Sequence, residues 1–229
     1  MRGTRRVLGT ALAGVTLSGL MATGLAVGAG AAPAPAPQLA KDFTAQACEA
    51  PVRLFDGSST DGWYQAGPGG FDVVDGTLQS RDGMGLLWYD EQQFDDYILM
   101  LDWRVTAETD NSGVFVRFPD PGDDPWVAVD EGYEIQINDN PAGDPQKTGS
   151  IYNHQEPSSY PSNEVGEWNR YVIKIVGERY QVFLNGTLVN DFTSTDPARG
   201  LEGYVGLQNH DPETRTQFRN IWVQPLCGD

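Results

Sequence analysis

Residues 181–189 read Gln-Val-Phe-Leu-Asn-Gly-Thr-Leu-Val, and this stretch decides the fold class. Its Asn-Gly pair suits the two central positions of a type I′ turn, which both require positive φ. The aromatic and β-branched residues on either side favour extended backbone. The stretch therefore predicts an antiparallel β-hairpin, and the Asp-Gly pair within residues 73–78 predicts a second one.

Four further stretches alternate apolar and polar side chains with a period of two, which is typical of antiparallel strands that bury one face. In one of them, Val114, Val116 and Phe118 are expected on one face, with Phe115 and Arg117 on the other. No stretch keeps a helical apolar period for three turns. We expect an all-β fold, a two-sheet antiparallel β-sandwich of the jelly-roll type. The four stretches are Ile98–Val105, Val114–Phe118, Tyr133–Asn138 and Tyr204–His210.

The polar faces of these strands differ from an ordinary solvated surface. They carry amide, guanidinium, carboxyl and imidazole groups, which can make fixed hydrogen bonds to sugar hydroxyls. We interpret this set as a carbohydrate-binding face, with Tyr152 as an additional ring to stack on a sugar. The predicted substrate-binding residues are Asp102, Arg104, Arg117, Gln136, Asn138, Tyr152 and Gln208.

The first residues resemble an export signal. Arg2, Arg5 and Arg6 precede an uncharged stretch rich in Ala, Leu, Val and Gly, and small residues at 29–32 suit a signal peptidase. We predict a signal peptide at 1–32, a Pro/Ala-rich linker at 33–47 and one domain at 48–229. The protein is thus expected to be secreted, with no membrane attachment once the signal is cleaved.

The chain is strongly acidic, with a formal net charge of −17. Such a charge repels nucleic acids and anionic membranes, so neither is expected as a partner. Cys48 and Cys227 are the two cysteines of the chain, and an even pair in an exported protein predicts a disulfide. The protein is expected to be a monomer that binds an oligosaccharide or a keto-sugar.

The order of several short motifs resembles the 3-keto-disaccharide hydrolase family, over about residues 52–226. This resemblance implies a concanavalin-like jelly roll and chemistry on sugars oxidised at C3, where the ketone makes the C2 hydrogen acidic. A base removes that proton, the glycosidic oxygen leaves C1, and water adds back. The motifs are Leu54–Gly57, Gly62–Trp63, Val74–Leu78, Asp102–Arg104, Asn111–Arg117, Gly132–Ile137, Thr148–Tyr152, Gly166–Asn169, Leu184–Gly186, Gly206–His210 and Phe218–Ile221.

The candidate catalytic residues are Glu134, His210 and His154. A retaining glycosidase needs two carboxyl groups about 5 Å apart, whereas residues 134–138 offer one carboxylate and two amides on the shared face. Proton abstraction from a keto-sugar needs one base, so it suits this strand better. Histidine can shuttle protons or bind a metal near neutral pH, and the same three residues are the candidate ligands of a divalent cation.

Two alternatives remain open. Arg104 and Arg117 could instead form structural ion pairs with Asp102 or Glu134. The protein could also be a non-catalytic carbohydrate-binding module, whose polar face would look the same. Convergence of Glu134 and the two histidines on one spot favours an enzyme, because a binding module has no need of it.

Overall fold

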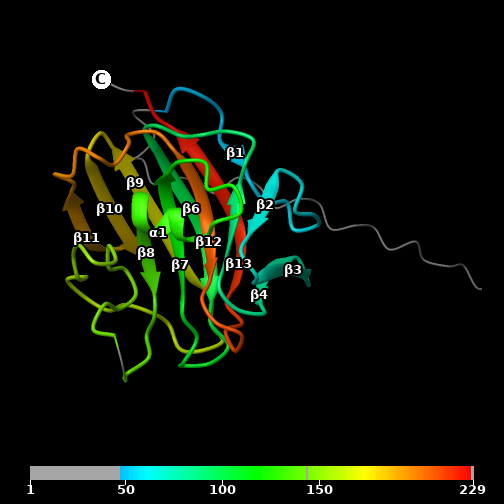
Figure 1. Ribbon diagram of the computed structural model, residues 1–229. Coiled ribbons are helices and arrows are strands. Elements are labelled where there is room, and N and C mark those ends of the chain that lie inside the picture. Colours follow the sequence, from blue (N-terminus) through cyan, green and yellow to red (C-terminus); the bar gives the residue numbers. More distant parts are fainter. Residues whose placement is uncertain (1–46, 143, 228–229) are drawn as a thin grey trace, which may run out of the picture. The chain divides into compact units, whose positions relative to one another are not determined.

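The computed structural model describes residues 47–142 and 144–227, and these form two antiparallel sheets (Figure 1). The predicted β-sandwich is therefore confirmed. The predicted signal peptide and nearly all of the predicted linker lie outside the described residues. No helix within the described residues is long and apolar enough to cross a membrane.

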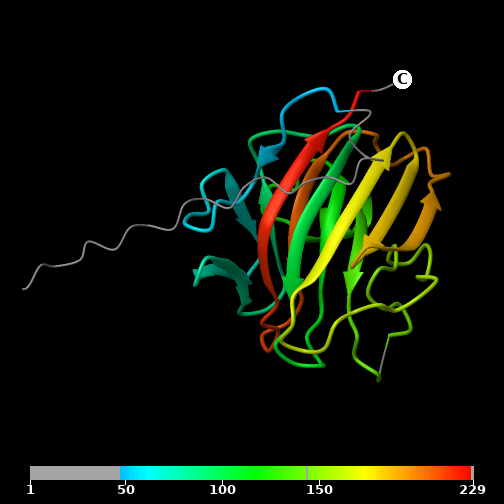
Figure 2. The same ribbon diagram turned by 180° about the vertical axis from the view of Figure 1, so that it is seen from behind.

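The large sheet has eight strands, in the order β11-β10-β9-β6-β13-β4-β3 with β1 paired to β13. Figure 2 shows this sheet from its outer side, with red β13, green β6 and yellow β9 next to one another. Its strands are β1 (Val52–Arg53), β3 (Gly70–Val74), β4 (Thr77–Arg81), β6 (Tyr97–Arg104), β9 (Asn169–Val176), β10 (Arg179–Leu184), β11 (Thr187–Thr193) and β13 (Gln217–Pro225).

The small sheet has five strands, in the order β2-β5-β12-β7-β8. These are β2 (Trp63–Ala66), β5 (Gly85–Tyr89), β12 (Tyr204–Asn209), β7 (Ser112–Phe118) and β8 (Tyr133–Ile137). The described residues contain one helix, α1 (Trp126–Glu131), which packs on β7 and β8.

Both predicted hairpins form. Asp75 and Gly76 join β3 to β4 with φ of 49° and 77°, and Asn185 and Gly186 join β10 to β11 with φ of 50° and 83°. Positive φ at both central positions is what a type I′ turn requires. The Asn-Gly signal in the sequence therefore reports this local geometry directly.

The core lies between the two sheets and is built from the apolar face of each alternating strand. Trp103 of β6 is fully buried and packs 5.5 Å from the ring of Tyr171 on β9. Val114 of β7 and Leu207 of β12 enter the same core from the small sheet. Because successive side chains of a strand point to opposite faces, the polar neighbours of these residues must lie on the two outer faces.

The alternation predicted for residues 114–118 is wrong at its end. The pairing of β12 with β7 shifts register, so that Val205 faces Val116 and Tyr204 faces Phe118, and Arg117 adopts a φ of 54°. Such a bulge inserts one extra residue and reverses the faces beyond it. Phe118 therefore joins Phe115 on the outer face, and Arg117 is turned to the interior.

The predicted disulfide joins Cys48 to Cys227, with 5.1 Å between the Cα atoms. Ala47, at the end of the predicted linker, forms a β-bridge with Leu226. The beginning and the end of the described domain are thus held together by a covalent bond and by backbone pairing.

The outer face of the small sheet has two parts. Ala128 of α1 covers an apolar part, where Phe115, Phe118, Leu86 and Trp88 are buried. Beyond the helix, the outward residues of β8 and β12 are polar instead. This polar part forms the floor of a pocket.

Candidate functional site

A pocket of about 300 Å³ opens on the polar part of the small sheet, beside α1. It combines a buried carboxyl group with amides, an imidazole, a phenol and an exposed indole ring. Concave sites with a few convergent polar groups are typical of ligand binding. Its lining residues are Met84, Asn111, Trp126, Val129, Glu134, Gln136, Asp144, Tyr152, Gln208 and His210.

Glu134 occupies the centre of this site because Gly113 gives it room. Gly113 lies on β7, next to β8, and has no side chain to fill the outer face. A Cβ atom at position 113 would lie 2.7 Å from Cγ of Glu134 and closer still to Oε1. The carboxyl group therefore lies across β7 and reaches the Gln208 side chain on β12.

Replacing Gly113 with Ala is expected to displace this carboxyl group and leave the fold intact. The atoms that the new Cβ would meet belong to the flexible Glu134 side chain and not to the backbone. We expect binding or turnover of a ligand of this pocket to fall at least about tenfold, because small misplacements of a group that contacts the ligand are costly. Steady-state kinetics and urea unfolding of Gly113→Ala check this, and unchanged kinetics in a folded variant would contradict it.

The environment of Glu134 raises the pKa of its carboxyl group to about 8, through burial and through the nearby Asp144 carboxylate. A hydrogen bond from Gln208 opposes this shift and is outweighed. The side chain is 5% exposed. A carboxyl group with a pKa near neutrality can both take up and release a proton at physiological pH.

Two buried acceptor atoms beside Glu134 have no partner among the described residues. They are Oε1 of Gln208 and Oδ1 of Asn111. Gln208 is 4% exposed. Buried polar atoms are nearly always hydrogen-bonded, so these two acceptors are open to donors from water or from the hydroxyl or amine groups of a ligand in the pocket.

His210 lies at the rim of the same pocket and is paired with Asp211. Its Nδ1 is 3.1 Å from Oδ2 of Asp211. Asp211 is itself held by the backbone amides of Glu213 and Thr214. Since Nδ1 is engaged, Nε2 remains as the nitrogen that a ligand can meet. His210 is one of the predicted catalytic residues, whereas Asp211, which is adjacent to it, was not predicted.

Tyr152 and Asp144 form a second polar pair in the pocket, and both lie in the long connection between β8 and β9. Burial and the Asp144 and Glu134 carboxylates raise the pKa of the Tyr152 hydroxyl, which also donates a hydrogen bond to Asp144. Tyr152 therefore stays neutral at physiological pH. Asp144 was not predicted, because its loop is brought over the sheet only by the tertiary fold.

Trp126 is a further lining residue that the sequence did not place. It begins α1, and 55% of its surface is exposed. An exposed indole next to convergent polar groups offers a flat apolar surface for a sugar ring. Nothing in the local sequence distinguishes it from the other tryptophans.

The structure does not bring His154 to this pocket. Its ring packs 5.1 Å from Tyr133 and 5.6 Å from Phe192. Burial and the positive charge of Arg199 lower its pKa. Tyr133 points to the inner side of β8, whereas Glu134 points to the outer side. His154, which packs on Tyr133, and Glu134 are therefore on different sides of the sheet.

Arg117 is also absent from the site, contrary to expectation. The bulge of β7 turns it inward, where Nη2 lies 3.1 Å from Oδ1 of Asp96 and 2.7 Å from the Asp95 carbonyl oxygen. Its side chain is fully buried. The alternative of a structural ion pair is therefore correct, although the partner is Asp96 and not Asp102 or Glu134.

Asp102 and Arg104 lie on the outer face of the large sheet, away from Glu134. Asp102 is 3.5 Å from Arg170 and 3.4 Å from Arg219 across neighbouring strands. Arg104 donates to Gln217 and lies over the Trp168 ring at 4.6 Å. Strand parity predicted their outward direction correctly, but it could not distinguish the outer faces of the two sheets.

Asn138 has the parity of Glu134 and Gln136, but it does not line the pocket. Its side-chain Oδ1 accepts a hydrogen bond from the backbone amide of Asn140, and its own backbone amide donates to Oγ1 of Thr148. It thereby shapes the loop that follows β8. Gln136, Tyr152 and Gln208 are the predicted substrate-binding residues that the structure does collect around Glu134.

The three predicted metal ligands do not form one cluster. Glu134 and His210 line the pocket, and His154 lies elsewhere. Among the residues that the structure describes, no three His, Cys, Asp or Glu side chains converge closely enough to hold a metal ion.

The model of the 3-keto-alpha-glucoside-1,2-lyase-like domain matches residues 50–224. The chain belongs to this family. The resemblance found in the sequence motifs is thereby confirmed, and the match includes every residue that lines the Glu134 pocket. No curated protein matches the chain.

Several solved structures share the fold of this chain. A protein from Parabacteroides distasonis ATCC 8503, described as a glycosyl hydrolase, has a TM-score of 0.66 at 20% identity and covers 83% of this chain and 99% of its own. Another such protein from the same organism has a TM-score of 0.59 at 26% identity, with coverages of 77% and 84%. The carbohydrate-binding module CBM66 from Bacillus subtilis has a TM-score of 0.50 at 17% identity, with coverages of 71% and 95%.

These matches agree with the architecture described above. Family and fold support a carbohydrate-related role, as a hydrolase or as a binding protein. What the pocket does to a sugar depends on its own residues.

Proposed function

We propose that this protein cleaves 3-keto-glycosides, with Glu134 as the base that removes the proton from C2. One observation carries the proposal: a buried carboxyl group with a pKa of about 8 lies at the floor of an open pocket, next to buried acceptors that lack partners. The family to which the chain belongs supports the same chemistry.

The reaction needs a proton acceptor at C2 and a proton donor at the glycosidic oxygen. The C3 ketone acidifies the C2 hydrogen, and Glu134 takes that proton while the electron pair forms an enolate with the ketone. The enolate then re-forms the ketone, a double bond forms between C1 and C2, and the C1–O bond breaks. The leaving oxygen is protonated, and His210, at the rim of the pocket, would donate that proton.

Addition of water to C1 completes a net hydrolysis. Water adds its hydroxyl to C1 and gives its proton to the deprotonated His210, so the products are a 3-keto-sugar and the free leaving group. Glu134, which holds the proton from the first step, can return it to C2. Amide groups of Gln136 and Gln208 would orient the sugar hydroxyls, and Trp126 would stack on a ring.

The pH dependence follows from the pKa of Glu134. Because the active form of a base is unprotonated, a pKa of about 8 leaves most of Glu134 protonated at pH 6 to 7. We expect kcat/KM to rise as pH increases from 6, by about tenfold per unit at most, and to level off above about 8. Rates measured across this range after subtraction of the uncatalysed reaction check this, and a rate that falls with pH would assign Glu134 the role of an acid.

The direct test is turnover. The purified protein is incubated with 3-ketotrehalose, a 3-keto-α-glucoside, with and without EDTA, and released glucose is followed by NMR. In deuterated water, exchange at C2 should accompany release, since the C2 proton is removed first. Release with C2 exchange supports the proposal, and EDTA sensitivity would add a divalent cation to it.

A binding module is the second candidate, and the exposure of Trp126 beside the pocket favours it as much as it favours an enzyme. If unoxidised glycans bind but no 3-keto-glycoside is cleaved across several linkages, the protein is such a module. The buried Glu134 with its raised pKa argues for the enzyme, because binding alone does not require a group that titrates near neutrality.

We also propose that the protein acts outside the cytoplasm. The Cys48–Cys227 disulfide is typical of oxidising compartments. Its sugar partner would then be an extracellular glycan or a fragment of one.

A further inference from the structure

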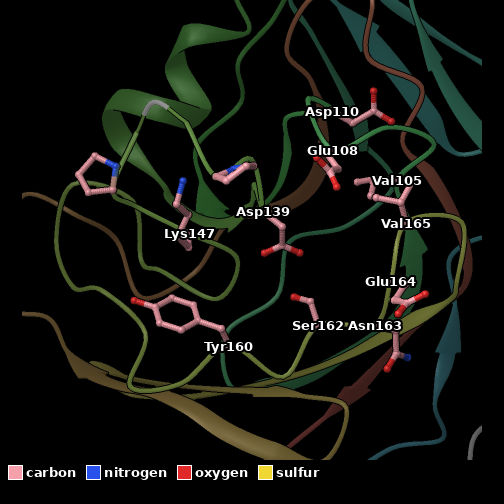
Figure 3. A pocket seen from close by; sticks show the side chains of 12 residues that line it. Val105, Glu108, Asp110, Asp139, Lys147, Tyr160, Ser162, Asn163, Glu164 and Val165 are labelled. Carbon is pink, nitrogen blue, oxygen red and sulfur yellow. The ribbon is translucent and has the colours of Figure 1, made fainter.

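A second and larger cavity, of about 890 Å³, lies among the loops that follow β6 and β8. Figure 3 shows the side chains of Asp139, Tyr160 and Ser162 around its centre, with Glu108 and Glu164 farther along the wall. This volume is at the upper end of the range for small-molecule sites. No step of the proposed reaction uses it.

The cavity and the Glu134 pocket are lined by neighbouring residues at two stretches of chain. Asp144 lines the pocket and Pro145 lines the cavity, while Asn111 lines the pocket and Asp110 lines the cavity. Successive Cα atoms are 3.8 Å apart. The linings of the pocket and of the cavity therefore adjoin, so one extended molecule can contact both.

The walls of the cavity have the chemistry of a sugar site. Tyr160 is 61% exposed, so its ring is free to lie against an apolar sugar face. Ser162 contributes a buried Oγ that lacks a hydrogen-bond partner among the described residues. The exposed carboxylate of Asp139 can accept hydrogen bonds from a pair of hydroxyl groups.

Charge restricts the kind of sugar. The lining contains four carboxylates and one ammonium group, and that ammonium, of Lys147, donates to the Asn140 carbonyl oxygen. Uronic acids and sulfated sugars would be repelled by such a wall. The carboxylates are also spread apart, since no three of them converge on one cation within the described residues.

We propose that this cavity is a subsite for the neutral sugar units that extend from the cleaved bond. The inference rests on the proposed function. The Glu134 pocket, at about 300 Å³, has room for about one sugar ring. We assign these units to the leaving group that departs from C1 of the keto-sugar. The natural substrate is therefore a 3-keto-oligosaccharide longer than a disaccharide.

The test compares substrate lengths. The kcat/KM of wild type, Tyr160→Ala and Asp139→Asn is measured with a 3-keto-disaccharide and with its neutral 3-keto-tetrasaccharide homologue. Tyr64→Ala is the matched control, because Tyr64 is an exposed aromatic residue of β2 that lines neither cavity. Urea unfolding of each variant shows that the fold is retained.

We expect wild type to prefer the longer substrate by about tenfold or more, a preference equivalent to about 1.4 kcal/mol. Tyr160→Ala and Asp139→Asn should lose most of this preference, whereas Tyr64→Ala should keep it. A wild type without length preference, or a Tyr160→Ala variant that keeps it, would overturn the subsite.

Failure of the proposed function would look different. If wild type cleaves neither substrate, binding of the unoxidised tetrasaccharide is measured by calorimetry for wild type, Tyr160→Ala and Tyr64→Ala. Binding that Tyr160→Ala alone weakens would support the subsite on a non-catalytic module. Absent binding, or binding that Tyr160→Ala leaves unchanged, would overturn it.

Discussion

Replacing Glu134 with Gln is expected to lower kcat/KM for a 3-keto-α-glucoside by about 10²- to 10⁴-fold, the usual contribution of a general base. Gln is nearly isosteric and fits the same space over Gly113, but its amide cannot accept the C2 proton. Binding of the substrate should be retained, because the orienting groups Gln136, Gln208 and Trp126 are untouched. Exchange of the C2 hydrogen with solvent should disappear together with turnover.

Glu178→Gln is the matched control. Glu178 is exposed in the turn between β9 and β10 and does not line the pocket. Its replacement makes the same Glu-to-Gln change at a position away from the pocket. Equal activities of Glu134→Gln and wild type would refute Glu134 as the base, and equal losses in both variants would point to a general charge effect.

The stability of the Glu134→Gln variant gives a readout that is independent of any substrate. Burial raises the pKa of Glu134 from 4.5 to about 8, so between these values the folded state holds a proton that the unfolded state releases. The free energy of unfolding of wild type should therefore decrease as pH rises from about 5 to 8, by at most about 1.4 kcal/mol per unit. Glu134→Gln should lack this decrease and be the more stable protein at pH 8.

Removing the disulfide is expected to cost about 2–5 kcal/mol of the free energy of unfolding. Cys48 and Cys227 are 179 residues apart, so their bond closes almost the whole domain into one loop. A loop of this length restricts the unfolded chain strongly, which is the main source of the stabilisation in the chain-entropy account. Urea unfolding of Cys48→Ser/Cys227→Ser against wild type measures the loss.

Wild type treated with a reductant is the control for this variant, since it loses the bond but keeps both side chains. The two should unfold at similar urea concentrations. The backbone pairing of Ala47 with Leu226 is too short to replace a covalent closure. A double variant within about 0.5 kcal/mol of oxidised wild type would show that strain in the native bond cancels its benefit.

The polar set predicted from the strands was correct in direction except at Arg117, but it was not correct in grouping. Glu134, Gln136, Gln208 and His210 line one pocket, whereas Asp102 and Arg104 lie on the opposite outer face of the sandwich, among partners on β9 and β13. Strand periodicity says which side of its own sheet a residue faces. It does not say which of two sheets a strand joins.

The short-range signals determined the class of fold. The Asn-Gly and Asp-Gly turns set two hairpins, the alternation of Trp103 and its neighbours set the buried faces, and the two cysteines set the closure of the domain. The turns and the alternation depend only on a residue and its immediate neighbours. The closure depends on the pairing of the two cysteines. The order of the motifs likewise indicated the family, which the domain match confirms.

Only the tertiary structure decided the site. The bulge at Arg117 depends on how β7 pairs with β12, so the alternation within residues 114–118 could not reveal it. The space that Gly113 leaves for Glu134, the raised pKa of that carboxyl group and the arrival of Trp126 and Asp144 all come from strands and loops that are distant in the chain. Packing and burial act through space, and the sequence by itself records only what lies next along the chain.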